Sequence, residues 1–154
     1  MINYLQAKKI LKKAKIKIRD EEIFINDSLN RVVSKDILST SDYPLSDNAA
    51  FDGFAINSND TKVVNKKNIK HFRIIGSIAA GNKPLNKKVK KFETAEIMTG
   101  GVIPKMFNTI VQSDQSNFYQ NKTNQKSIII DQKIKKFNYV RIKETDYKHK
   151  QHII

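Results

Sequence analysis

The chain has 154 residues, of which 39% are hydrophobic, so it is long enough for about one domain with a buried core. It contains no cysteine, which excludes disulfides, thiolate metal sites and a cysteine nucleophile. No apolar run approaches the ~20 residues of a membrane-spanning helix, and the first residues carry no signal-peptide pattern, so we expect a cytoplasmic protein.

The formal net charge of +14 raises the question of a polyanionic partner such as nucleic acid or an anionic membrane. Only four of the 29 basic residues are arginine, and the lysines are spread along the whole chain. Surfaces that grip phosphates usually rely on arginine. The excess of lysine is therefore best explained by compositional drift in an AT-rich genome. The alternative is a surface selected to bind a polyanion. We expect neither a specific nucleic-acid partner nor a membrane partner.

The first predicted element is a helix over residues 2–17, within an N-terminal segment that we place at 1–18. Tyr4, Ala7 and Leu11 recur at helical spacing, and no proline or glycine interrupts the pattern. Lysines fill the other face, which we interpret as a solvated surface. A membrane-binding or partner-binding helix is the weaker alternative, because the apolar stripe has no large aromatic or leucine-rich face.

Residues 19–45 form a predicted linking segment. Residues 21–25 are expected as a short strand or an extended link, and Asn26 and Asp27 are suitable caps for a short helix that follows. Asn30 can adopt a left-handed backbone and end that helix.

The segment 46–147 has short apolar stretches bounded by turn residues, which is typical of β-strands. The predicted strands are Phe54–Ile56, Phe72–Ile75, Ala95–Met98, Thr109–Val111, Ser127–Ile130 and Tyr139–Ile142. The polar run 116–126 is predicted to be a hairpin tip. The fold class is therefore mixed α/β, mainly β: an N-terminal helix followed by a small β-barrel or sandwich-like lobe.

The first cluster of polar residues lies at the start of this lobe. Asp47, Asn48 and Asp52 lie within six positions, next to Gly53, whose missing side chain lets the backbone approach closely. The plain alternative is that these side chains cap a turn and satisfy backbone amides. On chemistry alone that alternative is favoured.

A second cluster, Thr99-Gly100-Gly101, ends a predicted strand. Consecutive backbone N–H groups and a hydroxyl at such a turn can bind an oxyanion. A plain glycine turn is the alternative.

A third cluster lies in the last predicted strand and just beyond it. Arg141 and Lys143 are followed there by Asp146. The alternative to a functional site is an exposed face of ion pairs, which contribute little to stability.

The three clusters, in this order, resemble the motifs of the molybdopterin molybdenumtransferase family, which includes MoeA and the gephyrin E domain. Asp47–Ala55 resembles DNSAMDGYA, Ile97–Pro104 resembles IMTGAPVP, and Val140–Asp146 resembles VRxxGED. Leu29–Ile37 is also similar to the family's LGRVLAEDV. The resemblance covers roughly residues 4 to 154.

The resemblance implies a homodimeric enzyme that inserts molybdate into adenylated molybdopterin, its two substrates, and releases AMP. It assigns catalytic roles to Asp52, Thr99 and Asp146, with Asp52 and Asp146 as ligands of Mg²⁺. The residues that it assigns to substrate binding are Asp47, Asn48, Gly53, Gly100 and Gly101. A molybdate dianion also needs cations nearby, for which Lys143 and Arg141 are the candidates, with solvated side chains as the equal alternative.

The chain departs from the family's motifs at several positions, including Ala49, Phe51 and Gly101, where the family has Ser, Met and Ala. Glu144-Thr145 replace the family's Gly-Glu before Asp146, and Lys150 stands where the family has a glycine. The family's pterin-binding, MogA-like domain has no counterpart here, so 148–154 would be the truncated start of the next segment. We therefore expect part of an enzyme, inactive alone, that works as a homodimer or with a separate pterin-binding half. The alternative is a non-catalytic dimerisation or binding module left by gene decay.

Overall fold

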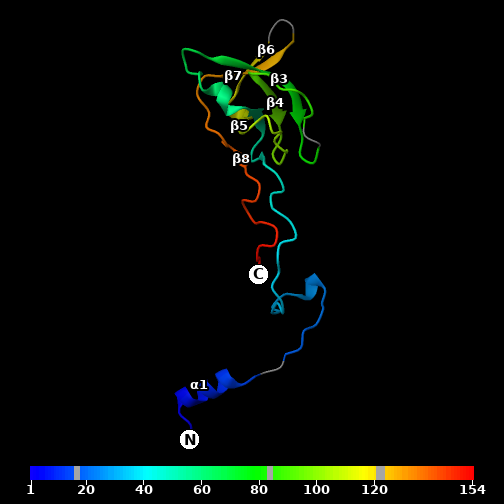
Figure 1. The fold of residues 1–154 in the computed structure, drawn as a ribbon, viewed down its shortest axis with the longest axis vertical. Helices are drawn as coiled ribbons and strands as arrows, with labels where there is room; N and C mark the ends of the chain where they lie inside the picture. Colours follow the sequence, from blue (N-terminus) through cyan, green and yellow to red (C-terminus); the bar gives the residue numbers. More distant parts are fainter. Residues whose placement is uncertain (16–17, 83–84, 121–123) are drawn as a thin grey trace. The chain divides into compact units, whose positions relative to one another are not determined.

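The computed structural model describes residues 1–15, 18–82, 85–120 and 124–154 (Figure 1). The chain divides into two compact units, Met1–Ile37 together with Ile154, and Leu38–Ile153. We call the second unit the lobe. Among the described residues, no helix is long and apolar enough to cross a membrane.

Helix α1 (Tyr4–Lys13) is shorter at both ends than the predicted helix 2–17. It begins later because Asn3 caps it: the Asn3 side chain accepts from the backbone N–H of Gln6 at 2.9 Å, and the Gln6 side chain accepts from the backbone N–H of Asn3 at 3.0 Å. It ends at Ala14, which has an extended backbone. Residues 16–17 of the predicted helix lie outside the described residues.

The rest of the first unit has little regular structure. The short helix predicted near residue 26 is a 3₁₀ turn, η1 (Ile25–Asp27), and no strand forms over 21–25, so the extended link is the correct alternative. Asn30 has the predicted left-handed backbone, with φ 63°. None of the described residues in 1–37 is buried. This unit therefore has no core of its own.

The lobe is built on a six-stranded sheet that curls into a half-barrel (Figure 1). Its strand order is β5-β2-β4-β3-β7-β6, and all neighbours are antiparallel except β3 and β4. The short strands β1 and β8 pair separately. The strands are β1 (Asn48–Ala49), β2 (Gly53–Ile56), β3 (Lys70–Ile78), β4 (Glu93–Ile97), β5 (Thr109–Gln112), β6 (Asn117–Gln120), β7 (Lys126–Ile130) and β8 (Val140–Arg141). Two further 3₁₀ turns are η2 (Ser58–Thr61) and η3 (Ser113–Gln115).

The predicted fold class, mainly β with one N-terminal helix, is confirmed. All six predicted strands form, but the sequence analysis missed β1 and β6. Part of the predicted tip 116–126 is strand β6, and residues 121–123 lie outside the described residues. Strand β6 escaped prediction because its ends are polar. Its Phe118 nevertheless packs edge-on against Phe54, with ring centroids 5.2 Å apart.

The core lies on both faces of β2. Phe54 belongs to one buried cluster with Phe72 and Ile128, and Ala55 belongs to another with Ile97. Because successive side chains of a strand point to opposite faces, β2 is covered on both sides. This explains why its sequence is a continuous apolar run.

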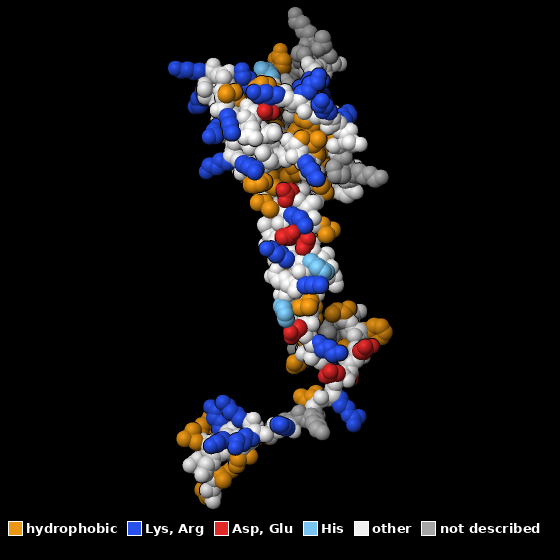
Figure 2. All heavy atoms as spheres, viewed as in Figure 1, with side chains coloured by type: hydrophobic (Ala, Val, Ile, Leu, Met, Phe, Trp, Pro, Cys, Tyr) orange, Lys and Arg blue, Asp and Glu red, His pale blue; other side chains and the backbone are white. Residues whose placement is uncertain are grey.

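The basic side chains do not gather in one stripe on the face that Figure 2 shows. Lys and Arg are scattered there over the lobe, with hydrophobic and neutral side chains between them. This distribution fits solvated lysines better than a single phosphate-binding track.

Two left-handed residues stand at positions where the motifs that the sequence resembles have glycine. Glu144 has φ 66° and Lys150 has φ 63°. The chain therefore keeps a glycine-like backbone at both positions despite the changed residues. A side chain in this region costs roughly 1–2 kcal/mol.

The close approach of β2 to β5 makes Gly53 the most constrained glycine of the sheet. A Cβ there would lie 2.1 Å from the carbonyl oxygen of Val111. We expect Gly53→Ala to lower the free energy of unfolding by about 3 kcal/mol or to prevent folding, because two paired backbones would have to separate. The matched control is Gly76→Ala, whose Cβ meets only the flexible end of Leu85 at 3.1 Å. Equal stability of the two variants in urea unfolding would contradict this explanation.

We expect Lys150→Gly to raise the free energy of unfolding by about 0.5 kcal/mol, because relief of the left-handed strain exceeds the entropy cost of glycine. Glu144→Gly should gain less, because it also removes an ion pair with Lys143 (Nζ–Oε1 2.9 Å). Lys148→Gly serves as the control, since Lys148 has no positive φ. Thermal unfolding of the three variants tests this order, and stabilisation by Lys148→Gly as large as by Lys150→Gly would refute it.

Candidate functional site

Strand β1 brings the three motif segments together. The backbone N–H of Ala49 donates to the oxygen of Gly101 at 3.0 Å, and Gly100 N–H donates to the oxygen of Ala49 at 2.8 Å. On its other side β1 pairs with β8, with Asn48 opposite Arg141. Segments about 50 and 90 residues apart therefore meet at two residues.

The closest contact between the first and second motifs joins Asp52 and Thr99. Asp52 Oδ1 accepts from the backbone N–H of Thr99 at 2.6 Å and from its hydroxyl at 2.7 Å. The backbone bond, followed by the hydroxyl bond, lowers the pKa of Asp52 below its usual value. Asp52 is therefore an exposed, ionised carboxylate. Its Oδ2 has no partner among the residues that the structure describes.

The glycines of the site have structural reasons to be glycine. Gly100 has φ 79°, and a Cβ on Gly101 would lie 2.9 Å from both the Ile97 side chain and the Met98 oxygen. Gly53 must also be glycine, because a Cβ there would collide with the backbone of β5. Their predicted roles in substrate binding stay predictions.

Asp47 and Asn48 connect the first motif to the third. The Asp47 carboxylate accepts from the backbone N–H of Lys143 at 2.8 Å, and its carbonyl accepts from Ile103 N–H at 3.0 Å. Asn48 is half-buried in β1. Asp47 therefore holds the backbone of the site in place through its carboxylate, whereas Asn48 does so through the backbone pairing of β1.

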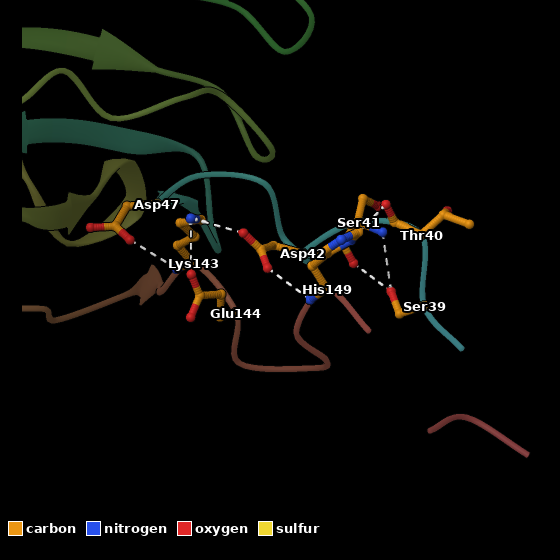
Figure 3. A network of polar contacts seen from close by, with 8 residues as sticks. All are labelled: Ser39, Thr40, Ser41, Asp42, Asp47, Lys143, Glu144 and His149. Atoms are coloured by element: carbon orange, nitrogen blue, oxygen red, sulfur yellow. Dashed lines mark hydrogen bonds and ion pairs between the residues drawn. The ribbon is translucent and has the colours of Figure 1, made fainter. Parts of the chain in front are cut away.

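Lys143 is the centre of the polar network drawn in Figure 3. Its ammonium lies 2.9 Å from a carboxylate oxygen of Asp42 and 2.9 Å from one of Glu144, which raises the pKa of Lys143 well above its usual value. Asp42 also accepts from the backbone N–H of His149 at 2.9 Å, and these bonds lower the pKa of Asp42. Lys143, expected as a cation for molybdate, is thus already paired with two carboxylates.

Arg141 and Asp146 form an ion pair with each other. The guanidinium also lies over the ring of Tyr43, 5.0 Å from its centroid, and the bond to Asp146 raises the pKa of Arg141. The predicted catalytic Asp146 therefore has a charged partner. Among the described residues, no group of three or more His, Asp or Glu side chains is arranged to hold a metal ion.

Sequence reasoning missed Asp42 and Tyr43 as parts of this region. No local pattern pointed to them, because their partners, Lys143 and Arg141, lie about 100 residues further along the chain. The available signal for this ion pair was an acidic residue, Asp42, just before the first motif and a basic residue, Lys143, in the third.

The Asp52–Thr99 contact predicts a pH-dependent stability. Because the pKa of Asp52 is lowered in the folded chain, its contribution is present at neutral pH and is lost as the pH falls through that lowered pKa. Thr99→Val removes the hydroxyl bond and should destabilise the chain at neutral pH more than under strong acid. Thr99→Ser keeps the hydroxyl and should behave like the unmodified chain. Urea unfolding across pH measures this, and a pH-independent loss in Thr99→Val would count against the contact.

The chain matches a known protein family over nearly its whole length. Residues 2–154 match the family described as the MoeA N-terminal region (domain I and II). The chain is 30% identical over 115 residues to a molybdopterin molybdenumtransferase of Staphylococcus epidermidis, covering 75% of this chain and 27% of that protein. It is 35% identical over 94 residues to the Staphylococcus aureus enzyme, covering 61% and 22%. The chain thus spans about a quarter of the length of these relatives.

The fold has a solved counterpart. The molybdopterin biosynthesis MoeA protein of Pyrococcus horikoshii OT3 superimposes with a TM-score of 0.87 at 24% identity, covering 100% of this chain and 39% of that one. A second structure of the MoeA protein from the same species gives a TM-score of 0.78 at 27% identity. With its motifs joined at β1 and its whole length matched, the chain belongs to the MoeA N-terminal region family, whose members act in molybdenum cofactor biosynthesis.

Proposed function

We propose that this chain supplies one wall of the active site of a molybdopterin molybdenumtransferase, which inserts molybdate into adenylated molybdopterin and releases AMP. The contact between Asp52 and Thr99 carries this proposal. It joins two family motifs, and it holds an ionised carboxylate with one free oxygen at the surface. The matched region is 27% of the Staphylococcus epidermidis relative, and we assign the pterin to the remainder of such an enzyme. A homodimer partner or a separate pterin-binding half would complete the site, in the cytoplasm.

The donor atoms at Asp52 fit Mg²⁺, the ion that the family implies. Mg²⁺ keeps several waters and is usually held by one or two carboxylates together with substrate phosphates. Asp52 Oδ2 can serve as one such ligand, while Asp146 would first have to leave Arg141. We therefore assign the ion to Asp52, with Asp146 as the less favourable second ligand. The bound ion would supply charge neutralisation for the phosphates of the adenylate.

Thr99 has the complementary role in this proposal. Its N–H and hydroxyl fix the carboxylate of Asp52, so the free oxygen keeps one orientation when substrate arrives. Pre-ordered charge of this kind contributes to rate because it needs no rearrangement during the reaction.

The test combines the chain with a separately expressed pterin-binding half of a relative. AMP release from adenylated molybdopterin, with molybdate and Mg²⁺ present, should appear only in the mixture. Asp52→Asn should reduce that release about 100-fold, which is the usual loss when one preorganised charge is removed. Glu96→Gln, an exposed neutralisation on β4, should leave it unchanged.

A second candidate is a non-catalytic dimerisation or binding module. It is favoured by the first unit, in which none of the described residues is buried. The same unit exposes apolar side chains on α1, including Leu5 and Leu11 at 72% and 74% exposure. If the mixture releases no AMP at any ratio while both parts are folded, this second candidate replaces the enzyme.

A further inference from the structure

Tyr139, which directly precedes the third motif, contacts the bend that carries Asp52. Its carbonyl oxygen accepts a hydrogen bond from the backbone N–H of Ala50 at 3.0 Å. Its ring packs edge-on against the ring of Phe51, with the two centroids 5.2 Å apart. Since Asp52 is the next residue along the bend, Tyr139 holds the two residues that lead into the carboxylate.

Tyr139 is itself attached to the sheet through its neighbour. The carbonyl of Asn138 accepts from the backbone N–H of Ile110 at 2.9 Å, and the Asn138 side chain donates to the oxygen of Ile110 at 3.2 Å. Tyr139 also packs against the buried cluster that contains Ala55 and Ile97. The sheet therefore supports the ring, and the ring can support the bend.

The backbone of Tyr139 is left-handed, with φ 54°. This conformation is unfavourable for a residue with a side chain, and it persists only where the surrounding contacts fix it. Residues held in such conformations occur often beside functional sites. The left-handed backbone is thus a second indication that the placement of this residue matters for the site.

Phenylalanine at position 51 makes the ring contact possible. Phe51 is one of the departures from the first motif, since the motif that it resembles has Met there. Two aromatic rings packed edge-on attract each other beyond the effect of burial alone. Phe51 is still 48% exposed, so the contact with Tyr139 contributes more to its placement than burial does.

We propose that Tyr139 is a positioning residue for Asp52. Its ring and its carbonyl oxygen hold the bend, so that the Asp52 carboxylate stays within reach of both donors of Thr99. The consequence for catalysis rests on the proposed function, whereas the placement of the carboxylate can be measured in this chain alone.

The test follows the pH dependence of the Thr99 amide proton by NMR in variants of the 154-residue chain. Tyr139→Ala keeps the left-handed strain but removes the ring. Because an aromatic pair changes an equilibrium constant a few-fold, the titration midpoint of Asp52 should rise by about half a pH unit. Tyr139→Phe keeps the ring and should titrate as the unmodified chain does. The matched control is Phe137→Ala, since Phe137 is also left-handed, with φ 62°, but its ring lies against the ammonium of Lys136.

A second variant removes the same contact from the exposed side of the pair. Phe51→Leu should raise the midpoint as much as Tyr139→Ala does, and the double variant should raise it no further, because both changes remove one interaction. If Tyr139→Ala does not fold, Phe51→Leu decides alone. An unchanged midpoint in Phe51→Leu, or an equal rise in Phe137→Ala, would overturn the proposal.

The effect on catalysis is measured in the mixture with the pterin-binding half. Tyr139→Ala should lower kcat for AMP release about tenfold with little change in KM, because a misplaced carboxylate weakens the transition state more than substrate binding. Tyr139→Phe should restore kcat. Normal release by Tyr139→Ala, where Asp52→Asn releases little, would refute the positioning role. Normal release by Asp52→Asn would instead refute the proposed function, and the NMR titration would still decide whether Tyr139 positions the carboxylate.

Discussion

The two-residue strand β1 is the constraint on which the site depends. Ala49 exchanges backbone hydrogen bonds with Gly100 and Gly101 on one side, and β1 pairs with β8 on the other. Ala49 is 1% exposed, so this junction is both hydrogen-bonded and packed. This junction fixes the Thr99 turn beside the bend that carries Asp52. The hydrogen bonds between Asp52 and Thr99 are therefore a consequence of backbone pairing and not of side-chain attraction alone.

The ion pairs around β8 serve this junction. Lys143 pairs with the carboxylates of Asp42 and Glu144, and Arg141 pairs with Asp146. The Asp47 carboxylate accepts a hydrogen bond from the backbone N–H of Lys143. Exposed ion pairs add little stability singly, and among the described residues only the pair between Lys143 and Asp42 joins the segment 39–47 to the segment 141–149 (Figure 3). Arg141 adds a contact between these segments because its guanidinium lies over the ring of Tyr43. The cations first expected to meet molybdate therefore hold the chain together, which leaves Asp52 as the group most available to a substrate or a metal.

Much of the fold was predictable, because the strands of the lobe are apolar runs bounded by turn residues. Strand β6 was not predictable, because its ends are polar and its sequence shows no alternating apolar pattern. It is a strand because its backbone pairs with β7. The motifs identified Asp52, Thr99 and Asp146, but no local pattern encodes the partners of Arg141 and Lys143. Glu144 shows a further limit of sequence-based prediction. Its replacement of the glycine in the family's motif suggested a changed backbone, but the left-handed conformation is kept.

The central claim is that Thr99 donates to an ionised Asp52 in the folded chain. The most direct measurement is the pH dependence of the Thr99 amide proton shift by NMR. We expect one downfield step as Asp52 ionises, with a midpoint below the ordinary pKa of aspartate, because both bonds from Thr99 favour the charged form. A Thr99 amide that does not titrate, or that titrates at the ordinary value, would contradict the account.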